Sequence, residues 1–127
     1  MAPHPLVTSR CGILLCVALA GCATSLESPR DIGPIVLAPG QHHEDCVRLA
    51  AGDRVLFRFE SQPATAFSVR YQSGEARVFP FLRPPTESDS GFFFAAETQT
   101  YCFDWAADAT LEGPTKLSYH LSLERRP

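Results

Sequence analysis

The chain has 127 residues, with 11 Lys or Arg against 14 Asp or Glu and a formal net charge of -3 at pH 7. This length accommodates one ordinary domain and excludes a second once a short leader is set aside. The mild acidity and the scattered basic residues argue against nucleic acid as a partner.

The N-terminal segment has the layout of an export signal. Arg10 precedes a short apolar run over residues 13–20, which is too short to span a bilayer as a helix. The run ends in Leu19-Ala20-Gly21-Cys22, a small-residue tetrad that resembles the processing signal of bacterial lipoproteins. We therefore predict a lipoprotein signal peptide over residues 1–21. The alternatives are an ordinary secretory signal or an uncleaved anchor helix.

The lipoprotein resemblance implies a location for the protein. Signal peptidase II would cut before Cys22, whose thiol would carry diacylglycerol and whose new amino group would be acylated, for example with palmitate. Several acyl chains together make a stable membrane anchor. Ala23, rather than Asp, follows Cys22. This implies sorting to the outer membrane, where the protein would face the periplasm.

The next segment reads as a linker. Ala23–Pro34 is polar, rich in turn-forming residues and without hydrophobic periodicity. We predict a lipidated tether over residues 22–34 and a folded domain over residues 35–127.

Of the five cysteines, three are assigned to the leader and the anchor. Cys11 and Cys16 would leave with the signal peptide and Cys22 would carry the lipid, so Cys46 and Cys102 remain. In an oxidising periplasm we expect these two to form a disulfide, and two separate buried thiols are the alternative.

From residue 35 onward the hydrophobic pattern alternates with the period of β-strands and shows no convincing helical stretch. In Arg54–Glu60, for example, Val55, Phe57 and Phe59 share one face. Turn residues divide the pattern, and Arg83–Ser90 reads as a loop that contains Pro and Ser. About eight strands are predicted, at 35–37, 44–49, 54–60, 66–72, 76–82, 91–96, 100–106 and 115–124.

Such a series of short strands favours an all-β fold, a small antiparallel β-sandwich of jelly-roll type. The positions of the cysteines add a detail. Cys102 shares a strand face with Asp104, and Cys46 shares one with Glu44 and Arg48. Both sulfurs therefore lie on the polar faces of their strands. The disulfide is predicted to join the outer face of two neighbouring strands, or a sheet edge, without crossing the apolar core.

A further resemblance covers residues 46–123 and rests on short motifs in a fixed order: Cys46, Leu49–Asp53, Val55–Phe59, Ala66–Val69, Ser90–Ala95 and Tyr101–Phe103. This order resembles the GOLD domain, a jelly-roll-like β-sandwich of eukaryotic secretory cargo receptors. The resemblance implies the same cysteine pairing and a non-catalytic module that recognises protein or lipid. Vesicle trafficking is not carried over, because this sequence has neither the coiled coil nor the transmembrane helix of those receptors.

Candidate chemistry is sparse. His42-His43-Glu44-Asp45 is the only dense cluster of metal-capable side chains. Adjacent residues in an extended segment point to opposite sides, so His42 and His43 are weak metal ligands, and we predict no metal and no cofactor. No catalytic residue is predicted, because Gly-x-Ser-x-Gly, His-Glu-x-x-His and a Gly-rich phosphate loop are all missing from the sequence. His120 reads as a surface histidine.

Clustered phenylalanines supply the candidate binding surface. In an antiparallel strand the rings of Phe92, Phe93 and Phe94 face alternate ways, so at least one leaves the core unless both strand faces are covered. Phe79 and Phe81 raise the same question. An exposed aromatic patch at these five residues would be a binding surface, whereas a bulge or a doubly covered strand would hide it.

These features predict a non-enzymatic, lipid-anchored envelope protein that binds a partner protein or an envelope component through a strand edge or aromatic loops. A periplasmic inhibitor of an attacking enzyme, similar to lysozyme inhibitors, would also fit the sequence, with Arg83–Ser90 as the plugging loop. A metal-binding lipoprotein that uses His42 and His43 is a third hypothesis, and an enzyme without a recognisable motif is a fourth.

Overall fold

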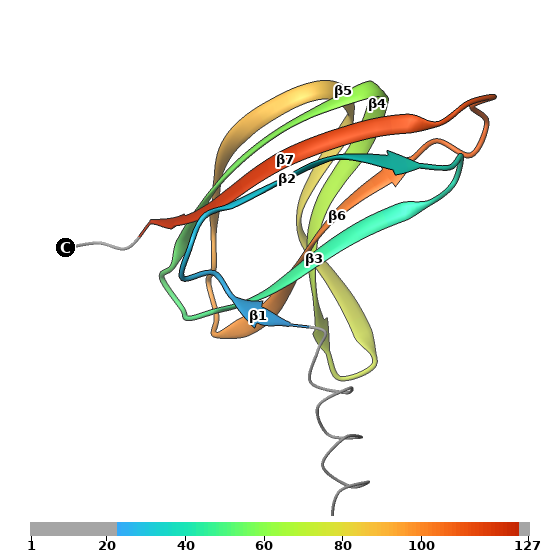
Figure 1. The fold of residues 1–127 in the computed structure, drawn as a ribbon. Helices are drawn as coiled ribbons and strands as arrows, with labels where there is room; N and C mark the ends of the chain where they lie inside the picture. Colours follow the sequence, from blue (N-terminus) through green and yellow to red (C-terminus); the bar gives the residue numbers. More distant parts are fainter. Residues whose placement is uncertain (1–22, 125–127) are drawn as a thin grey trace, which may run out of the picture.

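The computed structural model describes residues 23–124, which form β-strands joined by turns (Figure 1). The strands are β1 (Thr24–Ser25), β2 (Arg30–Leu37), β3 (His42–Leu49), β4 (Arg54–Ser73), β5 (Ala76–Phe94), β6 (Gln99–Ala107) and β7 (Thr115–Glu124). This part of the chain has no helix, which confirms the predicted all-β class. It also offers no helix that could cross a membrane. The predicted signal peptide and Cys22 lie outside the described residues.

The strands form one curled, mixed sheet in the order β1-β3-β6-β4-β7-β2, with β5 paired to β4. The β1–β3 pairing is parallel and all the others are antiparallel. Strand β4 belongs to two arms of the sheet: Arg54–Gln62 pairs with β7, and Thr65–Arg70 pairs with β6. Because β4 bends between these stretches, the two arms face each other (Figure 1).

The structure has seven strands, not the predicted eight or so, and they form a single curled sheet, so the predicted sandwich is not confirmed. The predicted strands at 54–60 and 66–72 are one strand, β4, and the predicted loop Arg83–Ser90 lies inside β5. The β4–β5 register shifts between Glu60 and Thr65 and again between Thr65 and Phe67. Such bulges bend a hairpin without ending its pairing, so the polar and Pro-containing stretches mark a bend and not strand ends.

The folded body begins well before Ile35, so the tether predicted over residues 22–34 is wrong for its described part. Strand β1 pairs with β3, and Leu26 is only 2% exposed. Strand β2 contains Gly33 at a bulge opposite β7, with a φ of 119°. A Cβ at Gly33 would lie 2.7 Å from the Leu117 carbonyl oxygen, so a close backbone approach explains the glycine. The sequence hid this segment because bulges and single apolar residues give no periodic pattern.

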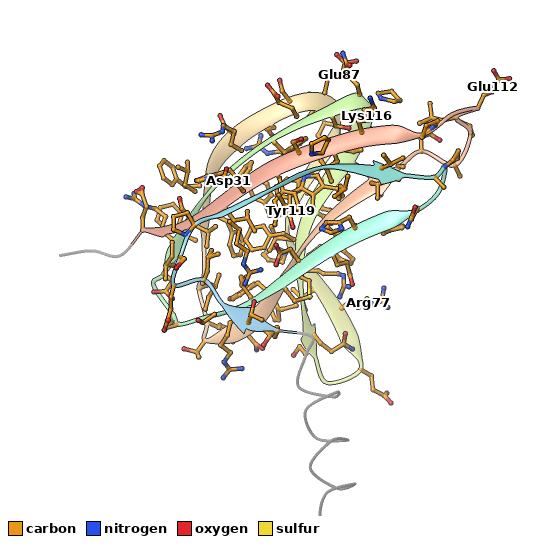
Figure 2. The ribbon with its side chains drawn as sticks, viewed as in Figure 1. Asp31, Arg77, Glu87, Glu112, Lys116 and Tyr119 are labelled. Atoms are coloured by element: carbon orange, nitrogen blue, oxygen red, sulfur yellow. A yellow bond between two sulfur atoms is a disulfide. The ribbon has the colours of Figure 1, made fainter. Side chains whose placement is uncertain are left out.

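The core lies between the two arms and is rich in aromatic rings. Tyr119 of β7 lies in the middle of the molecule (Figure 2). Trp105 of β6 stacks on it at 4.2 Å between ring centroids, although these strands are not hydrogen-bonded neighbours. Phe67 stacks on Trp105 at 5.1 Å, and Phe59 meets Trp105 edge to face at 6.1 Å. Offset and edge-on contacts of this kind add stability beyond the burial of area alone. The inward parity predicted for Phe57 and Phe59 is confirmed by their burial.

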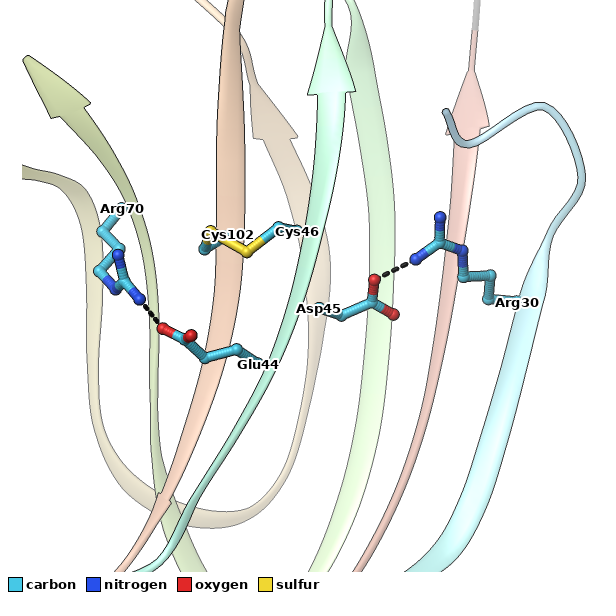
Figure 3. The surroundings of a disulfide bond; sticks show 6 residues. All are labelled: Arg30, Glu44, Asp45, Cys46, Arg70 and Cys102. Atoms are coloured by element: carbon cyan, nitrogen blue, oxygen red, sulfur yellow. Dashed lines mark hydrogen bonds and ion pairs between the residues drawn. A yellow bond between two sulfur atoms is a disulfide. The ribbon is translucent and has the colours of Figure 1, made fainter. Parts of the chain in front are cut away.

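The disulfide joins Cys46 of β3 to Cys102 of β6, as predicted (Figure 3). The two residues are direct register partners on adjacent strands, with Cα atoms 3.9 Å apart. Their neighbours Val47 and Tyr101 are buried, so the sulfurs lie on the opposite, outer face of the sheet. The predicted outer-face bridge between neighbouring strands is therefore confirmed.

We expect the double substitution Cys46→Ala/Cys102→Ala to lower the free energy of unfolding by about 4 kcal/mol, from the loop-closure entropy of 56 residues of sequence separation. Denaturant unfolding of the folded domain measures this loss. The wild-type domain under reducing conditions is the matched control and should behave like the double variant. A loss below about 1 kcal/mol would contradict the entropic account.

Candidate binding face

Two of the three consecutive phenylalanines point away from the core. Phe92 and Phe94 of β5 are 43% and 59% exposed, whereas Phe93 is 4% exposed and meets Tyr101 and Phe103 edge to face. The pleat of β5 sets this alternation, because one face of the strand covers the core and the other does not. Phe92 and Phe94 are therefore surface residues, and the prediction that Phe93 belongs to the same surface is wrong.

Arg54 holds the two exposed rings in place from the neighbouring strand β4. Its guanidinium carbon lies 4.6 Å from the ring centroid of Phe92 and 5.8 Å from that of Phe94. The same guanidinium forms an ion pair with Glu124 of β7 at 3.2 Å. Cation–π contacts at exposed sites contribute about 0.5–1 kcal/mol. The result is an ordered patch of two rings and a cation.

The other two candidate phenylalanines do not join this patch. Phe81 is half-buried and meets Phe57 edge to face at 5.4 Å, so it extends the core. Phe79 is 44% exposed, but it lies on the part of β5 that pairs with the second half of β4. The five predicted residues are thus divided between the core and two arms of the sheet.

A polar groove adjoins the aromatic patch on the same outer face. Along β5, Ser88 and Ser90 precede Phe92 and Phe94 with the same outward parity, and they pair with Glu60 and Arg58 of β4. Two adjoining hollows of about 460 and 310 Å³ share Glu60 and Ser118. The lining of the larger hollow is polar and includes Gln62, Glu87 and Lys116. The smaller hollow is mixed, because Ile32, Phe59 and Tyr119 line it beside Arg58 and His120. Short serine side chains between long charged ones leave these hollows open.

We call the patch and the groove together the binding face. It is formed by Arg54–Gln62 of β4, Glu87–Phe94 of β5 and Lys116–Glu124 of β7, with residues 31–33 of β2 at the smaller hollow. His120, which sequence reasoning read as a plain surface histidine, lies in the groove with Nδ1 2.8 Å from Asp31 Oδ1. Sequence reasoning missed the groove because its residues come from four strands, β2, β4, β5 and β7. The shared outward parity of 58, 60, 88 and 118 was the available signal.

The two adjacent histidines point to opposite faces of β3. His42 Nδ1 lies 3.0 Å from Asp104 Oδ2 on the outer face, and His43 Nε2 lies 3.0 Å from the Tyr119 hydroxyl inside. Residues 23–124 contain no group of three or more His, Cys, Asp or Glu side chains placed to hold a metal ion. The geometry therefore gives no support to metal binding by this pair.

A buried polar cluster links three strands. The Tyr119 hydroxyl donates to Asp45 Oδ2 at 2.7 Å, and Asp45 also pairs with Arg30 of β2 (Figure 3). Because Tyr119 gives its proton to Asp45, His43 Nε2 must donate to the Tyr119 oxygen. Burial, followed by the hydrogen bond to Asp45, raises the pKa of Tyr119 well above its ordinary value. In a strand, Asp45 falls on the same face as the apolar Val47 and Leu49. This position indicates an inward-facing carboxylate, which the sequence analysis did not predict.

Comparison with family models and with curated proteins identified no relative of this chain. No protein family model and no curated protein matches the chain. Among solved structures, a de novo designed double-stranded β-helix matches at a TM-score of 0.37 and 16% sequence identity, covering 76% of this chain and 99% of the designed one. A similarity this low supports no argument about fold or function.

We expect Phe93→Ala to lower the free energy of unfolding by about 3–5 kcal/mol, because it leaves a cavity among Phe81, Tyr101 and Phe103. Phe92→Ala and Phe94→Ala, the matched controls on the outer face, should each cost less than about 1 kcal/mol. Denaturant unfolding of the three variants compares them directly. Equal losses at all three positions would show that β5 does not alternate as described.

The phenol of Tyr119 should make stability fall at alkaline pH. Because its pKa is raised in the folded state, its contribution is fully present below the ordinary tyrosine pKa of about 10 and is lost as the pH rises above it. We expect Tyr119→Phe to reduce this alkaline slope of the unfolding free energy. At neutral pH it should cost about 1–3 kcal/mol, because buried Asp45 loses a donor. Tyr71→Phe is the comparison: the hydrogen bond to Glu97 also raises the pKa of Tyr71, but this residue lies near the protein surface, so its substitution should reduce the slope less. An unchanged slope in Tyr119→Phe would refute the assignment.

Proposed function

We propose that the protein is a non-enzymatic, lipid-anchored component of the bacterial envelope that binds a partner protein or another envelope component. Its anchor is the lipidated Cys22, and it faces the periplasm from the outer membrane. The observation that carries the recognition role is the patch of Phe92 and Phe94, exposed beside Arg54 and next to an open polar groove.

The chemistry of the patch supports recognition. Aromatic residues and arginine are enriched in the centres of protein interfaces, and charged or polar groups surround them. Here the rings of Phe92 and Phe94 are exposed to water, whereas Phe93 between them is buried. The Arg54 contacts fix the rings before any partner arrives, which lowers the entropy lost on binding.

A binding role also fits the way the polar side chains are used. The cluster around Asp45 joins strands inside the molecule, where Asp45 is only 9% exposed. His42 and His120 each contact a single carboxylate, at Asp104 and Asp31. These contacts support a structural use of the titratable residues.

The described residues give little support to the inhibitor and metal-binding hypotheses. The inhibitor hypothesis relied on a plugging loop at Arg83–Ser90, and this segment is part of strand β5. The metal hypothesis relied on His42 and His43, whose side chains diverge. Neither hypothesis therefore has an observation that favours it over partner binding.

In-cell crosslinking with the full-length protein tests the proposal. We expect one envelope component to be recovered with the wild type, and the double substitution Phe92→Ala/Phe94→Ala to reduce its recovery about tenfold or more, as the loss of two interface anchors would.

The control is Leu82→Ala, which removes an apolar side chain that is more exposed than Phe92 or Phe94 and that lies on the part of β5 paired with the second half of β4. It should recover the component at the wild-type level. Recovery unaffected by the double substitution would rule out the aromatic patch as the recognition surface. A second control, Cys22→Ser, should leave the membrane fraction if the lipid is the anchor.

A further inference from the structure

The distance between the proposed lipid and the fold is much shorter than a tether would make it. Strand β1 begins at Thr24, two positions after Cys22 in the sequence. A chain of two residues spans at most about 7 Å. A lipid attached at Cys22 would therefore be joined to the chain within about 7 Å of the first strand of the sheet.

The start of the fold is firmly attached, so it cannot serve as a flexible linker itself. Thr24 and Ser25 pair with Val47 and Arg48 of β3. The Arg30 guanidinium donates to the Thr24 hydroxyl and, at 3.2 Å, to the Ser25 carbonyl. The same guanidinium pairs with the buried Asp45, and Leu26 is packed into the core. These contacts tie β1 to the centre of the molecule.

Strand β1 lies at one end of the sheet. Its parallel pairing with Val47 and Arg48 directs it toward the β3–β4 turn at residues 50–53, and Thr24 is level with Val47, about 13 Å before Ala51 along the strand direction. That turn contacts the β5–β6 turn, because Ala51 N donates to Thr98 Oγ1 at 3.0 Å and Gly52 N donates to the Ala95 carbonyl at 2.8 Å. We call β1 and these two turns the anchored end.

The opposite end holds the β2–β3 turn and the loop at residues 108–114. Gly40 N donates to the Ala107 carbonyl at 3.0 Å, which joins the two. Between Arg48 and His42 strand β3 extends about 20 Å, at 3.3–3.4 Å per residue. Glu112 extends beyond this at the end of the molecule remote from β1 (Figure 2).

We propose that the anchored end rests directly on the lipid headgroups and that the sheet stands away from the membrane, with the loop at 108–114 as its distal tip. This inference rests on the proposed lipidation of Cys22. The short connection to Thr24 carries it, because no spacer is available to hold the domain off the bilayer. The binding face then runs from Phe94 near the membrane to Lys116 near the tip, so its partner must be accessible at the membrane surface.

The test uses the full lipidated protein in vesicles of phosphatidylethanolamine and phosphatidylglycerol that carry a headgroup-labelled energy acceptor. A donor dye is attached to a single added cysteine at Ala51→Cys in the anchored end or at Glu112→Cys in the distal loop, both exposed, with the native disulfide left oxidised. We expect energy transfer from position 51 to exceed that from position 112 by about twofold or more, given the separation of roughly 20 Å along β3.

A matched control inserts a flexible Gly/Ser spacer of about ten residues between Ala23 and Thr24, enough to add roughly 17 Å of root-mean-square reach. The spacer should lower the transfer at position 51 and remove the difference between the two positions. Equal transfer at both positions without the spacer would overturn the proposal, because the domain would then lie flat or move freely. Failure of the labelled protein to bind vesicles at all would instead overturn the lipid anchoring, and the orientation with it.

Discussion

The bend in β4 is the constraint on which the rest of the structure depends. One strand supplies partners to both arms of the sheet, because Arg54–Gln62 pairs with β7 and Thr65–Arg70 pairs with β6. If β4 continued straight, the inner faces of β6 and β7 could not meet, and Trp105 would have no Tyr119 to stack on. The register shifts between Glu60 and Phe67 make the turn while β5 follows on the other side. A curled sheet can thus enclose a core without a second sheet.

Curling leaves a seam between β2 and β3, which are consecutive in the chain but do not pair. The cluster of Arg30, Asp45 and Tyr119 crosses this seam with side chains where backbone hydrogen bonds are missing. Burying a carboxylate is costly unless it is paired and hydrogen-bonded, and Asp45 has both kinds of partner. The cluster also holds Thr24 through Arg30, so the closure of the seam and the position of β1 depend on the same guanidinium.

Core and binding face share β5, and this couples stability to recognition. Phe93 turns inward to Tyr101 while its two neighbours turn outward under Arg54. The same alternation sets the serines of the groove beside the glutamate and arginine of β4. A change that shifts the register of β5 by one residue would exchange buried and exposed rings together, because the side-chain period of a strand is two. The rigid core therefore supplies the preorganised surface.

The sequence by itself determined the all-β class, the inward faces of the strands and the Cys46–Cys102 pair on the outer face, because each follows from a period of two or from counting cysteines. It also named the phenylalanines at 79, 81 and 92–94 as a candidate aromatic patch, but it left open whether any of these rings is exposed. Tertiary structure decided that Phe92 and Phe94 are outside, that Arg54 lies over them, and that Glu60 and Ser118 border a groove. It decided as well that Thr24–Ser25 and residues 30–34 belong to the sheet and that β4 bends without ending. These features depend on pairings between distant segments and on bulges, and neither leaves a periodic trace along the chain.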